Sequence, residues 1–206
     1  MSGIDVKNAA GVTVNIPRTA EDLYNALTDP TPAAVVGLSA VVSAPAFTRP
    51  ADTNGYVSGD LIANSVTAGS VVPLLFNVAR VNGGTGSIRR ARIFSSALTD
   101  VNAQVRLHLF RNSPTPAAGD SAGYSVNGVA ALYMGAFDGT LDSLFTDGVG
   151  GIALPRMGGE VNFHTLADVP NGAVGSLAIY GLLEARSVFS GTSGATYTVR
   201  LETFRD

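Results

Sequence analysis

The chain has 206 residues, of which 46% are hydrophobic and 14% charged, and its formal net charge is −3. It is too apolar for a disordered chain and long enough for one main domain with an arm. The low, slightly acidic charge argues against nucleic acid and anionic membranes as partners, and the absence of cysteine excludes disulfides, thiolate metal sites and cysteine nucleophiles.

The 24 glycines and the lack of long helix-favouring stretches predict strands joined by many turns. The first ten residues contain no apolar core of a secretory signal. The most apolar run, residues 33–47, is too short to span a bilayer and is interrupted by Pro45. We therefore expect a protein that is made in the cytoplasm and has no membrane partner.

Residues 1–36 are expected to form an N-terminal arm. Residues 12–16 predict a short strand, and Thr19 can cap a short helix with Asp22 three positions later. Apolar residues fall on one side of this helix at Ala20, Leu23 and Leu27. A short helix with a narrow apolar stripe needs a surface to lie on, so the arm is expected to attach to something else.

Residues 37–206 are expected to form an all-β domain. Runs of strand length, rich in β-branched and aromatic residues, are separated by turn clusters; they span residues 38–43, 55–63, 71–80, 87–95, 102–110, 129–137, 160–164, 176–186 and 195–204. Eight or nine strands without intervening helices form a sandwich, a jelly roll or a barrel. Of these we expect a jelly-roll-like antiparallel β-sandwich.

Three runs predict which faces are buried. In residues 104–110, Val105, Leu107 and Leu109 alternate with Arg106 and His108, which indicates one core face and one face that is wet or meets a partner. Residues 179–185 are apolar on both sides, as in a central strand between layers. In the last run, Tyr197, Val199, Leu201 and Phe204 are assigned to the core, with a phase slip near Thr203.

The stretch GDSAG at residues 119–123 fits the G-x-S-x-G pattern of a serine nucleophile. That pattern requires a strand before Ser121 and a helix after it, whereas a proline-containing loop precedes this serine and a strand-like run follows it. The only histidine after the serine is His164, with Asp138, Asp142 or Asp147 as the orienting acid. We interpret GDSAG as a flexible turn and expect no enzyme and no catalytic residue.

Metal and cofactor motifs are equally weak. Two histidines 56 positions apart do not form a zinc or iron site, and the acidic stretch at residues 137–148 lacks the spacing of a calcium loop. The stretch NGGTGS at residues 82–87 has no lysine after its glycines and leads into a strand, so it predicts a hairpin connection with positive φ. No metal and no cofactor is expected.

The most basic segment is RRAR, with Arg89, Arg90 and Arg92. On a strand Arg90 and Arg92 share a face, and Arg106 with His108 would lie beside them if the two runs paired. As a nucleic-acid site this segment is a weak candidate, because the domain is acidic overall and no aromatic residues are interleaved for base stacking. A solvated strand face and an interface that binds a partner's carboxylates both remain open.

Several segments between residues 47 and 206 resemble tailed-bacteriophage virion structural proteins of the head decoration or cement type. They are TRPADTNGYVSGDLIANS, FNVARVNGGTGSIRRARIFSS, VRLHLFRNSPTP, LYMGAFDG and the C-terminal YGLLEARSVFSGTSGATYTVRLETFRD, and they occur in matching order. The arm is outside this resemblance. It implies a β-sandwich on the outside of an icosahedral shell that clamps neighbouring major capsid subunits together, and it carries over no catalytic residue.

The resulting expectation is a capsid-stabilising protein on the virion surface, with the major capsid protein and other copies of itself, as a dimer or trimer, as partners. The arm and one sandwich face are expected to carry the interface, at Val12, Val14, Ile16, Leu23, Tyr24, Leu27, Arg90, Arg92 and Arg106. The alternative is a carbohydrate-binding or host-attachment module associated with a tail or fibre. Exposed tyrosines such as Tyr56 or Tyr124 would carry that activity, because the chain has no tryptophan.

Overall fold

The computed structural model describes residues 4–7, 13–16, 38–127, 132–142, 147–166 and 176–205. The chain divides into two units, Met1–Val36 and Gly37–Asp206. In the first unit, β1 (Ile4–Lys7) and β2 (Thr13–Ile16) form an antiparallel hairpin with Ile4 opposite Ile16 and Val6 opposite Val14. The strand β1 was not expected, and the expected helix after Thr19 lies outside the described residues.

The second unit is an all-β domain, as predicted, built around one antiparallel sheet of eleven strands. These strands are β3 (Leu38–Ser43), β4 (Phe47–Thr48), β5 (Leu61–Ile62), β6 (Leu74–Asn77), β7 (Thr85–Ser95), β8 (Gln104–Phe110), β11 (Tyr133–Thr140), β12 (Val149–Pro155), β13 (Val161–His164), β14 (Ala178–Ala185) and β15 (Thr196–Arg205). A separate short pair joins β9 (Thr115–Pro116) to β10 (Val126–Asn127). The described residues include two complete 3-10 turns, Ala68–Ser70 and Leu98–Asp100, and no α-helix is assigned among them.

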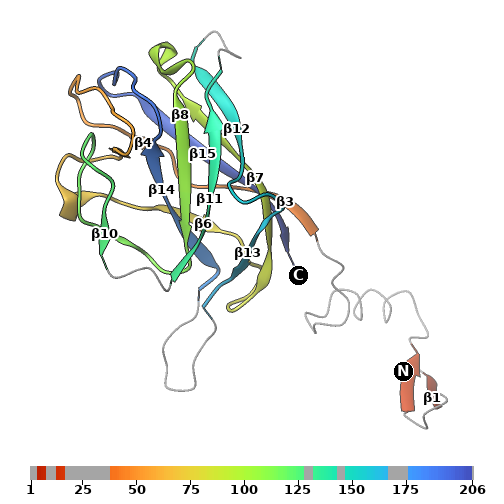
Figure 1. The fold of residues 1–206 in the computed structure, drawn as a ribbon. Helices are drawn as coiled ribbons and strands as arrows, with labels where there is room; N and C mark the ends of the chain where they lie inside the picture. Colours follow the sequence, from red (N-terminus) through yellow and green to blue (C-terminus); the bar gives the residue numbers. More distant parts are fainter. Residues whose placement is uncertain are drawn as a thin grey trace. The chain divides into compact units, whose positions relative to one another are not determined.

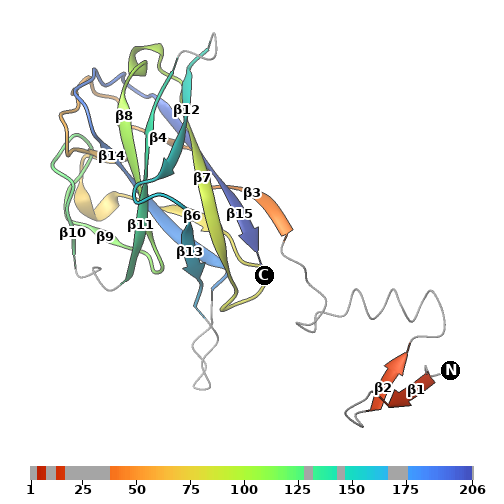
Figure 2. The ribbon, with the colours of Figure 1, turned by 45° about the vertical axis from the view of Figure 1, so that its right-hand side comes forward.

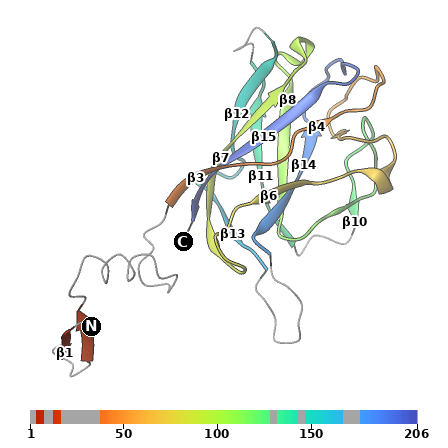
Figure 3. The same cartoon turned by 180° about the vertical axis from the view of Figure 1, so that it is seen from behind.

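The sheet curls so that its two halves face each other. Its order is β3-β15-β7-β12-β11-β8-β14-β5, with β4 also beside β15, β13 beside β7 and β6 beside β14. The strands β7 and β15 cross behind β8, β11 and β14 in Figure 1 and in front of them in Figure 3. At the two ends of the sheet, β3 and β6 approach each other. The right-handed twist of the strands produces this curl and encloses a core.

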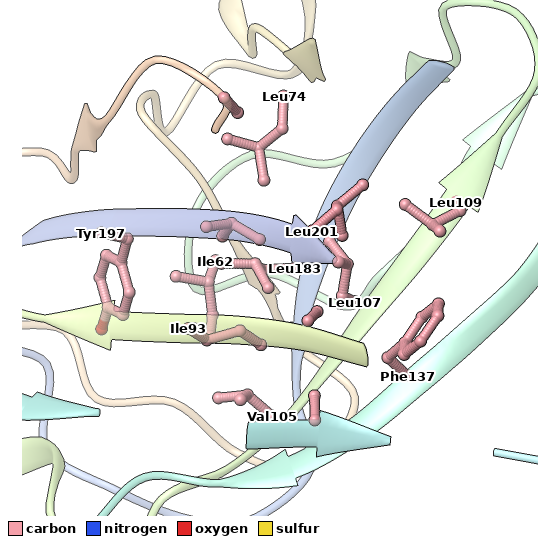
Figure 4. Packing of buried hydrophobic residues seen from close by; sticks show 14 of the residues in the cluster. Ile62, Leu74, Ile93, Val105, Leu107, Leu109, Phe137, Leu183, Tyr197 and Leu201 are labelled. Carbon is pink, nitrogen blue, oxygen red and sulfur yellow. The ribbon is translucent and has the colours of Figure 1, made fainter. Parts of the chain in front are cut away.

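Alternate residues of both halves fill that core. Tyr197, Val199 and Leu201 project from β15, while Leu107 and Leu109 project from β8, and all five are fully buried. Figure 4 shows the labelled side chains of β15 and β8, Tyr197 and Leu201 with Leu107 and Leu109, gathered with Ile93 of β7 and Phe137 of β11 between the strands. Burying each large aliphatic side chain contributes about 1.5–3 kcal/mol, so the core determines which face of each strand points inward.

The strand β14 is buried on both faces, as the sequence predicts for residues 179–185. A second, smaller apolar cluster covers its outer side, formed by Leu61, Ala63, Val71, Phe110 and Leu182. The expectation for the second face of β8 is wrong, because Arg106 is buried and His108 is half-buried among residues of the same chain. Their partners are charged and aromatic side chains of the neighbouring strands.

The phase slip expected near Thr203 of β15 is wrong. Thr203 is fully buried and continues the inward series, while Phe204 is half-buried beneath the guanidinium of Arg89. The irregularity lies in β7, where Arg89 is an extra residue between two residues that pair with consecutive residues of β15. A bulge of this kind shifts the alternation of one strand and leaves that of its partner intact.

The central strand β12 was not predicted from the sequence. It lies between β7 and β11, and it is aligned end to end with β13 along β7 (Figure 2). Its sequence begins with a valine and two glycines, which hide the alternation. Gly151 is required because a Cβ there would lie 2.0 Å from the carbonyl oxygen of Thr140.

Two further expectations about local structure are corrected. Residues 55–63 contain only the short β5, with isolated bridges at Tyr56 and Asp60, instead of one continuous strand. The NGGTGS segment contains a glycine with positive φ, Gly83 at 73°, but it joins β6 to β7, and these strands pair with other neighbours. It is therefore a turn between the two halves of the sheet and not a hairpin.

Candidate functional site

The outer face of β7 and β15 carries the predicted arginine pair. Arg90 and Arg92 project from the same side of β7, and both bind the carboxylate of Glu202 on β15, with 2.7 Å between Arg92 Nη2 and Glu202 Oε1. Burial opposes ionisation of Glu202, but hydrogen bonds from the two guanidiniums outweigh it and lower the pKa of this carboxyl group. Both arginine side chains keep 45% of their surface exposed.

The strand register extends this face across the sheet. Val41 of β3 lies opposite Glu202, Ile152 of β12 lies opposite Arg92, and Leu154 follows two positions later. These three aliphatic residues are 63%, 50% and 58% exposed. We call this surface of β3, β15, β7 and β12 the outer face. Exposed aliphatic residues among arginines are the composition found in protein–protein interfaces.

The placement of Arg106 beside Arg90 and Arg92 is wrong, because β12 and β11 separate β7 from β8. Arg106 side chain is only 10% exposed, and its Nη2 donates to Asp138 Oδ2 at 2.9 Å. The hydrogen bond from Arg106 lowers the pKa of the Asp138 carboxyl group. Arg106 therefore forms ion pairs within the domain, with Asp138 of β11 and with Glu184 of β14. The distance between Arg106 Nη1 and Glu184 Oε2 is 3.8 Å.

His108 joins a loop to the sheet. Its Nε2 lies 2.8 Å from Glu184 Oε2, its Nδ1 lies 3.2 Å from the Tyr133 hydroxyl, and its ring stacks on Tyr124 with 4.4 Å between centroids. Burial lowers the pKa of His108, although the hydrogen bond to Glu184 acts in the opposite direction. The expectation of an exposed Tyr124 is thus wrong, and Tyr56 is only 1% exposed.

The GDSAG turn belongs to a buried ionic centre. Its Asp120 accepts hydrogen bonds from Arg49 Nη2 at 3.0 Å, from the Tyr56 hydroxyl at 2.8 Å and from the Ala63 N–H at 2.8 Å. The Arg49 and Asp120 side chains are both completely buried. Burial raises the pKa of the Asp120 carboxyl group above its ordinary value, and the three donors offset only part of this increase. We call Arg49, Tyr56 and Asp120 the buried ionic centre.

This centre connects segments far apart in the chain. Arg49 also binds Asp52 Oδ1 at 2.9 Å, and a Cβ added to Gly191 would lie 1.7 Å from its Nη1. The RPADTNGY segment, GDSAG and the loop before β15 are thereby held together. Residues 49–56 and the GDSAG turn thus contribute to a buried ionic centre that stabilises the fold.

Ser121 lies at the edge of this centre with a positive φ of 54°. Its Oγ lies 3.4 Å from Arg49 Nη2 and 3.4 Å from Asp120 Oδ2. The strand that follows is β10, and His164 lies on β13, which pairs with the first residues of β7. The interpretation of GDSAG as a turn holds for its backbone, but its aspartate is buried and not a solvated loop residue.

The arm residues of the predicted interface are only partly described. Val14 and Ile16 lie in β2, while Val12, Leu23, Tyr24 and Leu27 lie outside the described residues. Across the described ranges, no group of three or more histidine, aspartate or glutamate side chains is placed to hold a metal ion. No helix in the same ranges is long and apolar enough to cross a membrane.

Sequence reasoning missed a hollow on the outer face. It has a volume of about 570 Å³, and its lining includes Arg92, Phe94, Thr198 and Arg200. The alternation of β15 places Arg200 on the same side as Glu202, which the sequence could have indicated. The pairing of β15 with β7, which brings Arg200 opposite Arg92, is a tertiary contact and has no local signal.

The described domain therefore belongs to the all-β class, with an arginine-containing outer face and a buried ionic centre. Neither a scan of protein-family models nor a search of curated protein sequences finds a match for this chain.

Proposed function

We propose that this chain is a non-enzymatic capsid decoration protein of a tailed bacteriophage. In this proposal a jelly-roll-like sandwich binds the outside of the major capsid shell and, with other copies of itself, clamps neighbouring shell subunits together. The observation that carries the proposal is the outer face, where Val41, Ile152 and Leu154 remain exposed among arginines. The resemblance of residues 47–206 to phage virion proteins supports the same assignment.

The contacts of the two candidate catalytic side chains, Ser121 and His108, favour a binding function over catalysis. Ser121, the residue expected in a hydrolase, contacts Arg49 and Asp120, which themselves hold the fold together. His108 is occupied by Glu184 and Tyr133. The hydrogen bonds of Ser121 and His108 thus stabilise the domain. The exposed arginine and aliphatic side chains of the outer face are the groups that we assign to binding a partner.

The arm supports a role in attachment. A two-stranded hairpin is at best marginally stable alone in water, so the β1–β2 hairpin gains stability from a surface that it can join. Its register aligns Ile4 with Ile16 and Val6 with Val14, which places apolar positions opposite one another. Repetition over a shell would turn a modest contact per copy into strong overall binding.

The test uses phage particles assembled without this chain. Purified full-length protein is added back, bound copies are counted after sedimentation, and the temperature at which the particles release DNA is measured. We expect saturable binding and a higher release temperature. Failure to bind such particles would contradict the proposal. Deleting residues 1–35 measures the share of the arm, and unchanged occupancy would remove the arm from the interface.

A matched set of variants tests the outer face. Ile152→Glu and Leu154→Glu place charges on this face, whereas Met157→Glu places one on a turn residue that is 93% exposed, between β12 and β13. We expect the first two to weaken particle binding at least about tenfold because each buries a charge at the interface, and the third to leave it unchanged. Equal effects of all three would contradict the assignment of this face.

A further inference from the structure

The hollow on the outer face combines cationic, aromatic and hydroxyl groups. It lies over β7 and β15, has a volume of about 570 Å³, and is lined in part by Arg92, Phe94, Thr196, Thr198 and Arg200. Its openness toward solvent follows from the exposure of both arginines. The groups that line it suit an anionic, hydrogen-bonding ligand.

Arg92 and Arg200 are direct cross-strand neighbours. Residues opposite each other on adjacent strands have Cβ atoms about 4.5–5.5 Å apart, and two like charges in this relation destabilise the sheet. Glu202 compensates part of this charge, but it binds Arg90 and Arg92. Within the part of the chain that the structure describes, Arg200 forms no ion pair with a carboxylate, since Glu202 is bound to Arg90 and Arg92. The pair therefore attracts a further anion.

The guanidinium of Arg200 has a defined place. Its Cζ lies 5.6 Å from the centroid of the Phe94 ring, a cation–π contact between two residues that both line the hollow. Thr196 and Thr198 lie on the same side of β15 and supply hydroxyl groups along the strand. A planar guanidinium held in this way presents two parallel N–H donors to a carboxylate.

We propose that the hollow between Arg92 and Arg200 binds a carboxylate side chain of an acidic polypeptide segment. An acidic saccharide fits less well, because Arg200 already covers the face of Phe94 on which a sugar ring would stack. The neighbouring surface continues as exposed aliphatic residues at Val41 and Ile152, which suits a polypeptide. Asp147 also lines the hollow and is exposed, but the three arginines, Arg90, Arg92 and Arg200, exceed the two carboxylates, Glu202 and Asp147, by one positive charge. Naming the shell protein as the source of the segment rests on the proposed function.

Binding of short peptides to the full chain tests this site. Hexaglutamate is titrated into the protein and followed by backbone amide chemical shifts, with hexaglutamine as the neutral control. We expect hexaglutamate to shift the resonances of β7 and β15 selectively, with an affinity that falls as salt concentration rises. No binding of hexaglutamate, or equal binding of hexaglutamine, would overturn the proposal.

Variants of arginine identify the groups responsible. Arg200→Ala is expected to weaken hexaglutamate binding about tenfold or more, as for loss of one charge-assisted hydrogen-bonded pair. Arg80→Ala removes an equal charge at an exposed position outside the hollow and is expected to leave the affinity unchanged. Arg200→Lys keeps the charge without the planar fork and is expected to fall between them. Equal affinity of Arg200→Ala and the unchanged chain would refute the site.

Two further readings complete the test. Thermal unfolding of Arg200→Ala confirms that the fold is retained, and Arg200→Lys replaces it if the alanine variant does not fold. N-acetylneuraminic acid is titrated as the acidic saccharide, and tighter binding than hexaglutamate through Arg200 would replace the polypeptide by a sugar. Peptide binding without particle binding would leave this site standing and remove the capsid function. The reverse result would remove the site alone.

Discussion

Removing the charge of Asp120 is the sharpest perturbation that the structure offers. Asp120→Asn keeps the shape of the side chain but removes the buried ionic partner of Arg49, which then keeps only the partly exposed Asp52. Both side chains are completely buried, and Asp120 also accepts from Tyr56 and Ala63. The substitution therefore affects three donors at one time, and all three lie between residues 49 and 63, far from Asp120 in the chain.

The expected loss is about 3–5 kcal/mol of unfolding free energy, the usual cost of leaving one member of a buried ion pair without its partner. For a domain of this size the melting temperature would fall by roughly 6–20 °C. Asp52→Asn is the matched control, since Asp52 binds the same guanidinium but its side chain is 27% exposed. Its expected cost is about 1 kcal/mol or less.

Urea unfolding of the full chain, followed by circular dichroism, measures these free energies. The double variant Arg49→Met with Asp120→Asn should cost less than the sum of the single variants by at least about 1 kcal/mol, because neither charge is then left alone. Costs that add to within about 0.5 kcal/mol, or equal costs of Asp120→Asn and Asp52→Asn, would refute the buried ionic centre.

Three further changes have defined outcomes. Gly191→Ala should cost about 1–3 kcal/mol in urea unfolding because its Cβ would lie 1.7 Å from Arg49 Nη1, while Gly69→Ala, with open space around it, should be neutral. Burial raises the pKa of Asp100, so the contribution of this residue to stability should fall as pH rises from about 3.8 through the folded-state pKa. In urea titrations at a series of pH values, Asp100→Asn should lack this decrease. Identical pH profiles of the variant and the unchanged chain would contradict the prediction. Burial lowers the pKa of His108, so stability should fall as pH drops from about 6.5 through the folded-state pKa; His108→Gln should flatten this loss, and an unchanged profile would count against the assignment.

The strands that the sequence predicted best have strong alternation. β3 has the expected bounds, and β8 and β15 agree within two residues at each end, because apolar residues at every second position belong to a single face. β14 agrees equally well, because its apolar run on both faces marks a strand buried between layers. β12 was missed because Gly150 and Gly151 interrupt its side-chain alternation, and at Gly151 the backbone of the neighbouring β11 approaches closely. From the sequence alone, a glycine that a close tertiary contact requires cannot be distinguished from a glycine in a turn.

The candidate site was predictable only in part. The shared face of Arg90 and Arg92 follows from strand geometry alone, and it was predicted. The separation of Arg106 from them, and the approach of Arg200 to Arg92, depend on which strands pair. Pairing is decided by long-range packing that the local pattern of β7 does not contain.

The sequence by itself determined the all-β class, the inward faces of the best strands and the two-sided burial of β14, because the side-chain period of a strand is a local property. The order of strands in the curled sheet was decided only in the tertiary structure. So was the role of GDSAG, whose aspartate became the partner of an arginine 71 positions earlier. A buried charge must find an opposite charge, and only the folded chain brings the two together.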